Sequence, residues 1–343
     1  MAQYKLNLSL SGGGVRGIIA ASLLKEFEDD LREGSLDGLV CTYAGTSIGS
    51  LLCAALLDGY SANDIVSKLF SFDALQNIFK NYSWFGRFPN YVNLGLFFPR
   101  YDGRNKRMLI EQSIRANMIR DWDKPFFVPL YDINYGDCRV IHKDVYKIKC
   151  AELLDAATAA PVLFPPVNIA LRDTVENRDV SGWFVDGAIG INDPSGVQLA
   201  SMIARQVKLQ DMGTIHIGYK PTYKTFSKKW FASWGAVQWA LAGDIISRIM
   251  YTPDQAAQYA CSAVMGSKFV NIVGDTVAQL DDFSADTYSM LMRQGRDLYE
   301  VYKPKIMTML QPIDGVSINS GEVFYKLPLA TDPNCESAIR HIH

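Results

Sequence analysis

The start of the chain alternates hydrophobic and polar positions, and this period changes at a glycine loop. Leu6, Leu8 and Leu10 alternate with polar residues, which predicts a strand. SGGGVRG at residues 11–17 interrupts the alternation, and residues 18–34 then have the spacing of an amphipathic helix. The opening therefore predicts a strand, a glycine loop and a helix.

A second unit of the same kind follows. Residues 39–45 read as a buried strand, residues 46–49 (TSIG) as a tight turn, and residues 50–59 as a helix of small residues that ends at Gly59. Two consecutive strand-turn-helix units favour a parallel sheet with helices on its faces. We therefore predict an α/β fold.

Further along the chain, the pattern predicts elements of both kinds. Strands are expected at 126–134, 138–142, 183–187 and 214–220, and helices at 103–119, at 151–160 and from Asp193-Pro194 onward, with a polar excursion at 171–179. Residues 230–302 read as mainly helical, with a short strand near 268–273. With no internal repeat or low-complexity linker, we expect a core over residues 1–220 and a helical C-terminal elaboration, 221–343, packed on the same domain.

Composition narrows the functional classes. The 343 residues are 48% hydrophobic, which excludes disorder as the main state, and a net charge of -2 offers no basis for binding a nucleic-acid polymer. The six cysteines are scattered without a CxxC pair, so we expect reduced thiols and no metal site. Neither a leader pattern nor an apolar run near 20 residues is visible, so we expect a cytoplasmic protein that does not cross a membrane.

The turn between the second strand and its helix carries a candidate nucleophile. Gly45-Thr46-Ser47-Ile48-Gly49 is a G-x-S-x-G sequence in a strand-turn-helix context. Gly45 and Gly49 allow a sharp turn that exposes the Ser47 hydroxyl at a helix N-terminus, where developing negative charge is favoured. We interpret Ser47 as a nucleophile, and the alternative is a serine that caps a helix.

The glycine loop after the first strand suits the same chemistry. Gly12, Gly13 and Gly14 can aim backbone N–H groups at an oxyanion, and Arg16 and Gly17 complete the loop. Gly12, Gly14 and Gly17 also satisfy the dinucleotide fingerprint G-x-G-x-x-G, which expects an acidic residue after the second strand. That strand ends in Tyr43-Ala44-Gly45 instead. An oxyanion hole is favoured, and phosphate binding by a nucleotide-dependent regulatory protein remains the alternative.

Histidine is scarce, which bears on the catalytic base. Of four histidines, His142 precedes the acidic candidate, and His341 and His343 lie in the C-terminal tail. His216 follows Ser47 and the acidic candidate, but it lies inside a strand pattern that favours a structural role. Asp186 follows the apolar WFV, so we expect it at the carboxyl end of a strand, where α/β sheets assemble their sites. The prediction is a Ser47–Asp186 dyad, against an ordinary Asp-Gly turn.

Several ordered blocks together resemble the patatin-like phospholipases. SGGGVRG is similar to their oxyanion loop, GTSIG at 45–49 to their nucleophile elbow, and DGA at 186–188 to their catalytic aspartate motif. AATAAPVLFPPV at 156–167 and IGINDP at 189–194 resemble two further family segments, with Asp193 where asparagine is commoner. The similar blocks span residues 6–218.

The resemblance implies a three-layer α/β/α fold with a mostly parallel sheet and a lipid acyl hydrolase of the phospholipase A type. Asp186 would deprotonate Ser47, which would attack the ester carbonyl while amides around Gly13 and Gly14 stabilise the oxyanion; neither metal nor cofactor is implied. Arg16 would orient the loop or meet a lipid phosphate, and a salt-bridged arginine at the helix start is the alternative. A constitutive, non-specific lipid esterase is a further alternative.

Two aromatic clusters and a basic strip suggest how lipid reaches such a site. Residues 79–101 read as a lid that carries Trp84, Phe85, Phe88, Phe97 and Phe98, and a second cluster holds Trp230, Phe231, Trp234 and Trp239. The strip at 219–230 interleaves Lys220, Lys224, Lys228 and Lys229 with aromatics and suits phosphates or anionic headgroups. Buried core and a solvated loop are the respective alternatives. The expected partner is a phospholipid membrane, contacted peripherally at the inner membrane.

Regulation is an expectation from the resemblance alone. Compact bacterial patatin-like enzymes with helical C-terminal elaborations resemble CBASS antiphage phospholipase effectors, which cyclic dinucleotides activate. This implies a cyclic dinucleotide activator, and it leaves the oligomeric state open, a homo-oligomer included.

Overall fold

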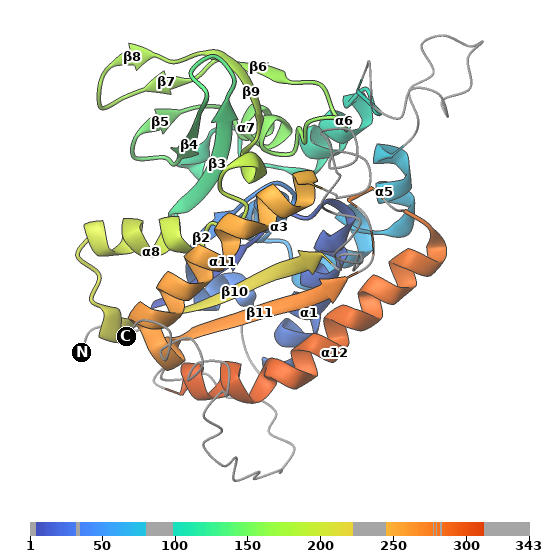
Figure 1. Cartoon of the computed structure of the whole chain (residues 1–343), viewed down its shortest axis with the longest axis vertical. Coiled ribbons are helices and arrows are strands. Elements are labelled where there is room, and N and C mark those ends of the chain that lie inside the picture. Colours follow the sequence, from blue (N-terminus) through green and yellow to red (C-terminus); the bar gives the residue numbers. More distant parts are fainter. Residues whose placement is uncertain are drawn as a thin grey trace, which may run out of the picture.

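A mixed, mostly parallel sheet forms the centre of the computed structural model (Figure 1), which describes residues 5–31, 35–79, 99–221, 245–276, 278, 280, 281 and 283–311. Its order is β11-β10-β1-β2-β3-β9-β6, with β4 beside β3. The parallel strands are β1 (Lys5–Leu10), β2 (Val40–Gly45), β3 (Phe126–Asp132), β10 (Met212–Pro221) and β11 (Phe269–Thr276). Antiparallel to their neighbours run β4 (Asp137–Ile141), β6 (Val167–Ile169) and β9 (Gly182–Asp186). The predicted fold class is confirmed.

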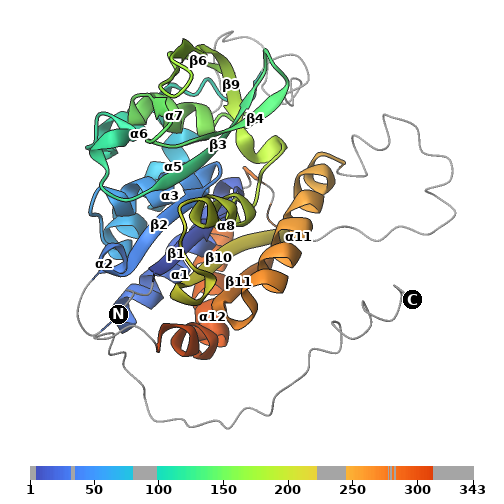
Figure 2. The same ribbon diagram turned by 90° about the vertical axis from the view of Figure 1, so that its left-hand side faces the viewer.

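Helices cover both faces of this sheet. In Figure 1, α11 (Ile245–Met265) and α12 (Ala285–Leu310) lie on opposite sides of β10 and β11. α12 packs on α1 (Gly17–Asp30), and α11 packs on α8 (Ser195–Ala204). Figure 2 shows α6 (Arg104–Ser113) and α7 (Cys150–Ala157) grouped with β3, β4, β6 and β9, away from β10 and β11. The shorter helices are α2 (Leu36–Leu39), α4 (Ala62–Asp64) and α5 (Phe72–Ile78).

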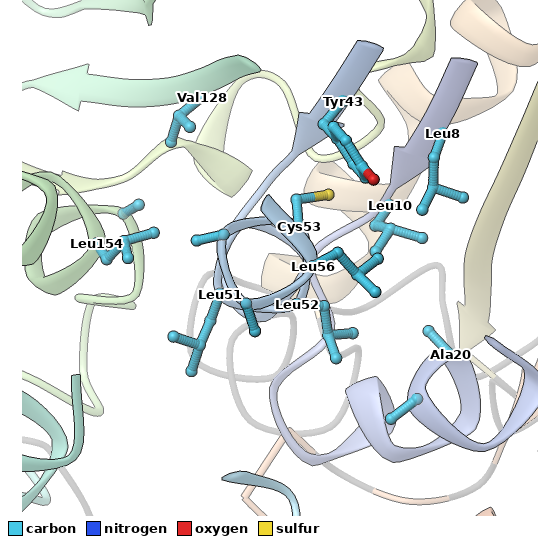
Figure 3. Close-up of a cluster of buried hydrophobic side chains, with 14 of the residues drawn as sticks. Leu8, Leu10, Ala20, Tyr43, Leu51, Leu52, Cys53, Leu56, Val128 and Leu154 are labelled. Atoms are coloured by element: carbon cyan, nitrogen blue, oxygen red, sulfur yellow. The ribbon is translucent and has the colours of Figure 1, made fainter. Parts of the chain in front are cut away.

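One helix is hydrophobic all round. α3 (Ile48–Leu57) is IGSLLCAALL, and its residues from Gly49 to Leu56 are all buried. Figure 3 shows it end-on, with Leu51, Leu52 and Leu56 pointing in different directions among side chains from β1, β2, β3, α1 and α7. Because a helix with no polar face has to be enclosed, this sequence places α3 inside the protein, and Ser47 directly precedes it.

Two predicted segments differ from the structure. The predicted polar excursion at 171–179 contains β7 (Arg172–Asp173) and β8 (Arg178–Asp179), which form a small sheet with β5 (Tyr146–Lys147). The Asp173 side chain accepts hydrogen bonds from the amides of Val175 and Glu176, which makes the turn between them. The expected helix at 103–119 ends at Ser113, because the chain then turns to bring the amides of residues 115 and 116 onto the Asp58 carboxylate.

The helix expected from Asp193-Pro194 is α8, which begins at Ser195. The Asp193 carboxylate accepts a hydrogen bond from the Ser195 amide at 2.8 Å, so it does the work of an N-terminal cap. The division into residues 1–220 and 221–343 stays a prediction. β11 pairs in parallel with β10, so chain from beyond residue 220 contributes a strand to the central sheet.

The contact between α1 and α12 is close enough to test. Gly295 lies against α1, where a Cβ would come within 2.5 Å of the Ile19 carbonyl oxygen and 2.6 Å of the Ser22 Cβ. We expect Gly295→Ala to lower the free energy of unfolding by about 1–3 kcal/mol, because the helices must separate. Urea unfolding measures this. Arg296→Ala, on an exposed position of α12, is the control and should change stability by less than about 0.5 kcal/mol; equal effects would contradict the close packing.

Candidate active site

Ser47 occupies a strained turn between β2 and α3. Its backbone has φ 54° and ψ -128°, a region that side-chain-bearing residues avoid. A Cβ on Gly45 would lie 2.6 Å from the Gly49 carbonyl oxygen, and one on Gly49 would collide with the carbonyl of Leu10 at the end of β1. Both glycines are therefore required by backbone contact, which explains the G-x-S-x-G sequence in physical terms.

Asp186 is brought to Ser47 from the other half of the sheet. It ends β9, it is 1% exposed, and its carboxylate accepts a hydrogen bond from the Ala188 amide at 2.9 Å. The Ser47 side chain lies close enough to this carboxylate to lower its pKa. Burial raises the pKa of Asp186 to about 6, although Ser47, the bond from the Ala188 amide and the charge of Lys106 oppose the rise. The predicted pair is thus in contact, with its carboxylate shielded from water.

The route by which Asp186 arrives differs from the expected one. β9 runs antiparallel to β3, with Asp186 opposite Leu130, so it does not belong to the common carboxyl edge of the parallel strands. β2 pairs with β3 through Tyr43 and Ala44, opposite Phe126 and Phe127. β3 therefore continues past the end of β2. The part of β3 that extends beyond β2 pairs with the end of β9 and so places Asp186 at the level of the Ser47 turn.

The glycine loop meets Ser47 from β1. Gly13 and Gly14 line the same cavity as Ser47, and within the described part of the chain their N–H groups have no hydrogen-bond partner. Gly12 differs, because its N–H donates to the Asn192 carbonyl at 3.2 Å. Gly14 has φ +57° and lies against the Leu280 carbonyl, where a Cβ would not fit. The amides free to meet an oxyanion are therefore those of Gly13 and Gly14.

Arg16 and Gly17 fix this loop to its surroundings. Arg16 is 8% exposed, and its Nε donates to the Ala278 carbonyl at 2.8 Å. The Val15 amide donates to the Leu280 carbonyl at 2.9 Å, so the chain after β11 holds the loop at two points. A Cβ on Gly17 would lie 2.7 Å from the Ile48 side chain, which keeps the loop close to the start of α3. These contacts favour an orienting role for Arg16.

An apolar cavity opens beside Ser47 and Asp186. Most of its lining is aliphatic or aromatic and includes Leu51, Phe70, Ile78, Phe79, Leu109, Ile110, Leu163, Phe164 and Leu280. The rings of Phe79 and Tyr101 meet edge to face with their centres 5.4 Å apart, and the centres of the Phe164 and Tyr101 rings are 5.5 Å apart. Such a surface suits a hydrocarbon chain and gives little to a polar ligand.

Besides Asp186, the cavity lining includes the charged side chain of Lys106, which no sequence motif marks. It is 4% exposed, donates to the Asp155 carbonyl at 2.7 Å, and lies 3.0 Å from the Asp155 carboxylate. Its ammonium also stands 4.8 Å from the centre of the Phe164 ring. Burial lowers the pKa of Lys106, while its charge lowers that of Asp186. In sequence it sits in RNKR, which reads as a solvated helix face.

His216 makes contacts of a structural kind. It is fully buried in β10, with Nδ1 at 3.3 Å from the Ser9 hydroxyl and Nε2 at 3.1 Å from the Asp193 carboxylate. Its ring stacks on Phe269 at 6.2 Å, and burial lowers its pKa. These contacts account for the ring without a bond to Ser47.

The rest of the predicted access surface lies mainly outside the described residues. This holds for Trp84, Phe85, Phe88, Phe97 and Phe98, for Trp230, Phe231, Trp234 and Trp239, and for Lys224, Lys228 and Lys229. Of the strip at 219–230, Tyr219 is buried, and its ring lies 2.5 Å from where a Cβ on Gly13 would be. Lys220 lies 3.9 Å from Asp275.

In the described ranges, no three His, Cys, Asp or Glu side chains converge as ligands for a metal ion. No helix there has the length and hydrophobicity that a membrane span needs.

Comparison with known proteins shows which family this chain, with its serine turn, glycine loop and aspartate, belongs to. Residues 8–197 match the family described as patatin-like phospholipase. The chain belongs to the patatin-like phospholipase family. It is therefore a member of a family of lipid acyl hydrolases, and the matched range holds Ser47 and Asp186.

Individual patatin-like relatives are distant. Patatin-like protein 1 of Arabidopsis thaliana is 29% identical over 68% of this chain, which spans 63% of that protein, and patatin group D-2 of Solanum tuberosum is 24% identical over 85% of this chain and 82% of its own length. Among solved structures, VipD of Legionella pneumophila has a TM-score of 0.40 at 13% identity and covers 91% of this chain and 67% of its own. ExoU of Pseudomonas aeruginosa, solved in complex with SpcU, has a TM-score of 0.38 at 15% identity. The match covers 90% of this chain and 53% of ExoU.

The electrostatics of the patatin-like site predict a pH dependence. Asp186 can take a proton from Ser47 only when ionised, so labelling of Ser47 by a fluorophosphonate should slow as pH falls through about 6. Lys106→Met removes a charge that lowers the pKa of Asp186, so the midpoint should move to higher pH. The midpoint is read from labelling rates across pH.

Arg107→Met is the matched control, because Arg107 is on the same helix, is half exposed and pairs with Glu111. Its midpoint should equal that of the unchanged protein. An unchanged midpoint in Lys106→Met would show that Lys106 does not tune Asp186.

Proposed function

We propose that this protein is a serine acyl hydrolase that cleaves fatty-acyl esters of membrane phospholipids, a reaction of the phospholipase A type. One observation carries the proposal: a serine on a strained turn lies beside a buried aspartate, and both line the same apolar cavity. Family membership supports the same reaction class.

In the proposed reaction, ionised Asp186 takes the proton of Ser47 as Oγ attacks the ester carbonyl. The Gly13 and Gly14 amides donate to the oxygen that becomes negative, and the positive end of α3 favours the same charge. The tetrahedral intermediate collapses when protonated Asp186 returns the proton to the leaving lysophospholipid oxygen. Water, deprotonated by Asp186, then attacks the acyl-enzyme carbonyl. As the bond to Ser47 Oγ breaks, Asp186 returns the proton to Oγ, and the fatty acid is released.

The cavity supports an acyl chain as the buried part of the substrate. Its walls are hydrocarbon and aromatic, so a fatty-acyl chain would leave water on entering, whereas a phosphate headgroup would lose its hydration without gaining partners. The headgroup would therefore remain outside, at the membrane surface. We place the protein peripherally on the inner membrane, with residues 79–101 as the segment through which lipid enters.

The rival reading of the glycine loop is less well supported. A phosphate cradle needs several N–H groups pointing at one polar site. Here the Gly12 amide donates to the Asn192 carbonyl and the Val15 amide to the Leu280 carbonyl. The amides left for a ligand, those of Gly13 and Gly14, belong to residues that line a mainly apolar cavity. The loop therefore favours a single oxyanion over a pyrophosphate.

We further propose activation by a cyclic dinucleotide in bacterial antiphage defence, on the resemblance to CBASS effectors alone. The glycine loop is not its binding site in this proposal. Homo-oligomer formation belongs to the same proposal.

Ser47→Ala should reduce fatty-acid release from phospholipid vesicles by at least about 10³-fold, because it removes the nucleophile. Asp186→Asn should reduce it by a similar factor, because an amide cannot accept the proton. Free fatty acid is quantified by mass spectrometry. Ser50→Ala is the control: Ser50 is buried on the next turn and bonds the Ser47 carbonyl, so it should retain most activity. Undiminished release by Ser47→Ala would overturn the dyad.

The regulatory proposal has a separate measurement. Fatty-acid release is compared with and without a panel of cyclic dinucleotides at fixed protein and vesicle concentration. We expect one member to raise the rate by at least about tenfold, a coupling of ordinary allosteric size. High activity that ignores every nucleotide would refute activation and leave the hydrolase intact.

A further inference from the structure

Residues 191–193 form a turn that touches both halves of the proposed site. The Gly12 amide donates to the Asn192 carbonyl at 3.2 Å, and the Thr46 hydroxyl donates to the Ile191 carbonyl at 2.9 Å. Gly12 belongs to the oxyanion loop and Thr46 precedes the nucleophile. The 191–193 turn therefore links the glycine loop to the residue before Ser47, in addition to the direct bond from the Thr46 amide to the Leu10 carbonyl.

This turn is held by one carboxylate from α11. Asp254 Oδ2 accepts from the Asn192 side-chain Nδ2 at 2.6 Å, and Oδ1 accepts from the Asp193 amide at 2.8 Å. Asp254 is 2% exposed, so both bonds are shielded from water. A residue about sixty positions away along the chain thus grips two adjacent residues of the turn.

The Asn192 side chain continues this linkage to the glycine loop. With Nδ2 bound to Asp254, Oδ1 faces Gly12, 2.6 Å from where a Cβ on that glycine would lie. Oδ1 is buried and has no hydrogen-bond partner among the described residues. An unsatisfied amide oxygen is unfavourable, so the bond to Asp254 is what fixes this orientation.

We propose that Asp254 is a positioning residue of the Ser47–Asp186 site, which fixes the oxyanion loop from α11 through the 191–193 turn. The inference rests on the proposed acyl hydrolase function. It makes α11, which lies beyond the matched family range, part of the catalytic geometry.

The ionisable groups around Asp254 define when it carries charge. Burial raises the pKa of Asp254 to about 7; the bond from Asn192 opposes this, and the nearby Asp193 charge adds to it. Asp193 lies 3.1 Å from His216, whose pKa burial lowers, and the pKa of Tyr251 on α11 is raised by burial. Asp254 is therefore the neighbour that changes charge near neutral pH.

The decisive variant is Asp254→Asn, which keeps the shape and cannot ionise. Its amide nitrogen would face the Asn192 Nδ2 donor, so the Asn192 amide must turn to accept from it, and the Asn192 Nδ2 group then faces Gly12 of the oxyanion loop in place of Oδ1. We expect kcat for ester hydrolysis to fall about 10- to 100-fold, the scale for small misplacement of reacting groups. KM should stay within about twofold, because the acyl cavity is untouched.

The matched control is Gln258→Met on the same helix. Gln258 accepts a hydrogen bond from Asn271 on β11 at 3.2 Å, and no hydrogen bond among the described residues joins it to the 191–193 turn. This variant removes one bond between α11 and the sheet while keeping the side-chain size. Its kcat should match that of the unchanged protein.

The pH profile separates positioning from mere stabilisation. In the unchanged protein, activity should fall on the acid side in two steps, near pH 7 as Asp254 gains a proton and near pH 6 as Asp186 does. Asp254→Asn should lose the step near 7 and keep the step near 6. A purely structural role would lower activity without removing one step.

As pH rises, the thermal stability of Asp254→Asn relative to the unchanged protein should increase, although its activity stays lower. The raised pKa means that the folded protein binds more protons at Asp254 than the unfolded chain, so this residue's contribution to stability falls as pH rises from the ordinary aspartate range to about 7. Asparagine has no such dependence. The melting temperature of Asp254→Asn should therefore rise relative to the unchanged protein as pH increases, while its kcat remains lower.

The outcomes distinguish the two proposals. If the unchanged protein shows no Ser47-dependent fluorophosphonate labelling, the hydrolase function fails. If labelling is normal but Asp254→Asn keeps its kcat or its acid step near pH 7, or if Gln258→Met is equally impaired, the positioning role fails and the hydrolase stands.

Discussion

The first turn of α3 rests directly on the end of β1, and the rest of the site depends on this backbone contact. Gly49 meets the Leu10 carbonyl without a side chain between them. Because α3 is enclosed on every side, it cannot move away without exposing leucines to water. Core packing therefore maintains the strained dihedrals of Ser47, together with the hydrogen bond that the Ser50 hydroxyl donates to the Ser47 carbonyl.

In the proposed function, the same exclusion of water serves substrate and chemistry together. The apolar cavity that suits a hydrocarbon chain also surrounds Asp186 with poorly solvating groups, which raises its pKa toward neutrality. A carboxylate is ordinarily too weak a base for a serine hydroxyl, and desolvation reduces this mismatch. Lys106 limits the effect, because its positive charge keeps Asp186 ionised near neutral pH. Asp254, which lies further from the cavity, is a second carboxylate whose pKa is raised mainly by burial.

Local signals in the sequence were sufficient for part of this arrangement. The Ser47 turn and the glycine loop are short, and their glycines are required by contacts within a few residues or with the adjacent strand. The apolar strand before Asp186 predicts its place at a strand end, although the antiparallel direction of β9 cannot be read from that pattern. No sequence pattern marks Lys106 or Asp254, since each acts through a partner some 50 or 60 residues away. Charged residues in helical patterns read as solvated until tertiary contacts bury them.

The pairing register of β9 fixes the position of Asp186, whatever the length of the loop between β7 and β8 that precedes it in the chain. Pairings with β3 on one side and β6 on the other set which residue stands opposite Leu130. β7 and β8 branch into a separate small sheet, and the turn between them reaches solvent at Val175 and Asn177. Length added at that tip need not be transmitted to β9. The loop is therefore a natural graft point, where an epitope or fluorescent reporter can be built into the protein without disturbing its catalytic register.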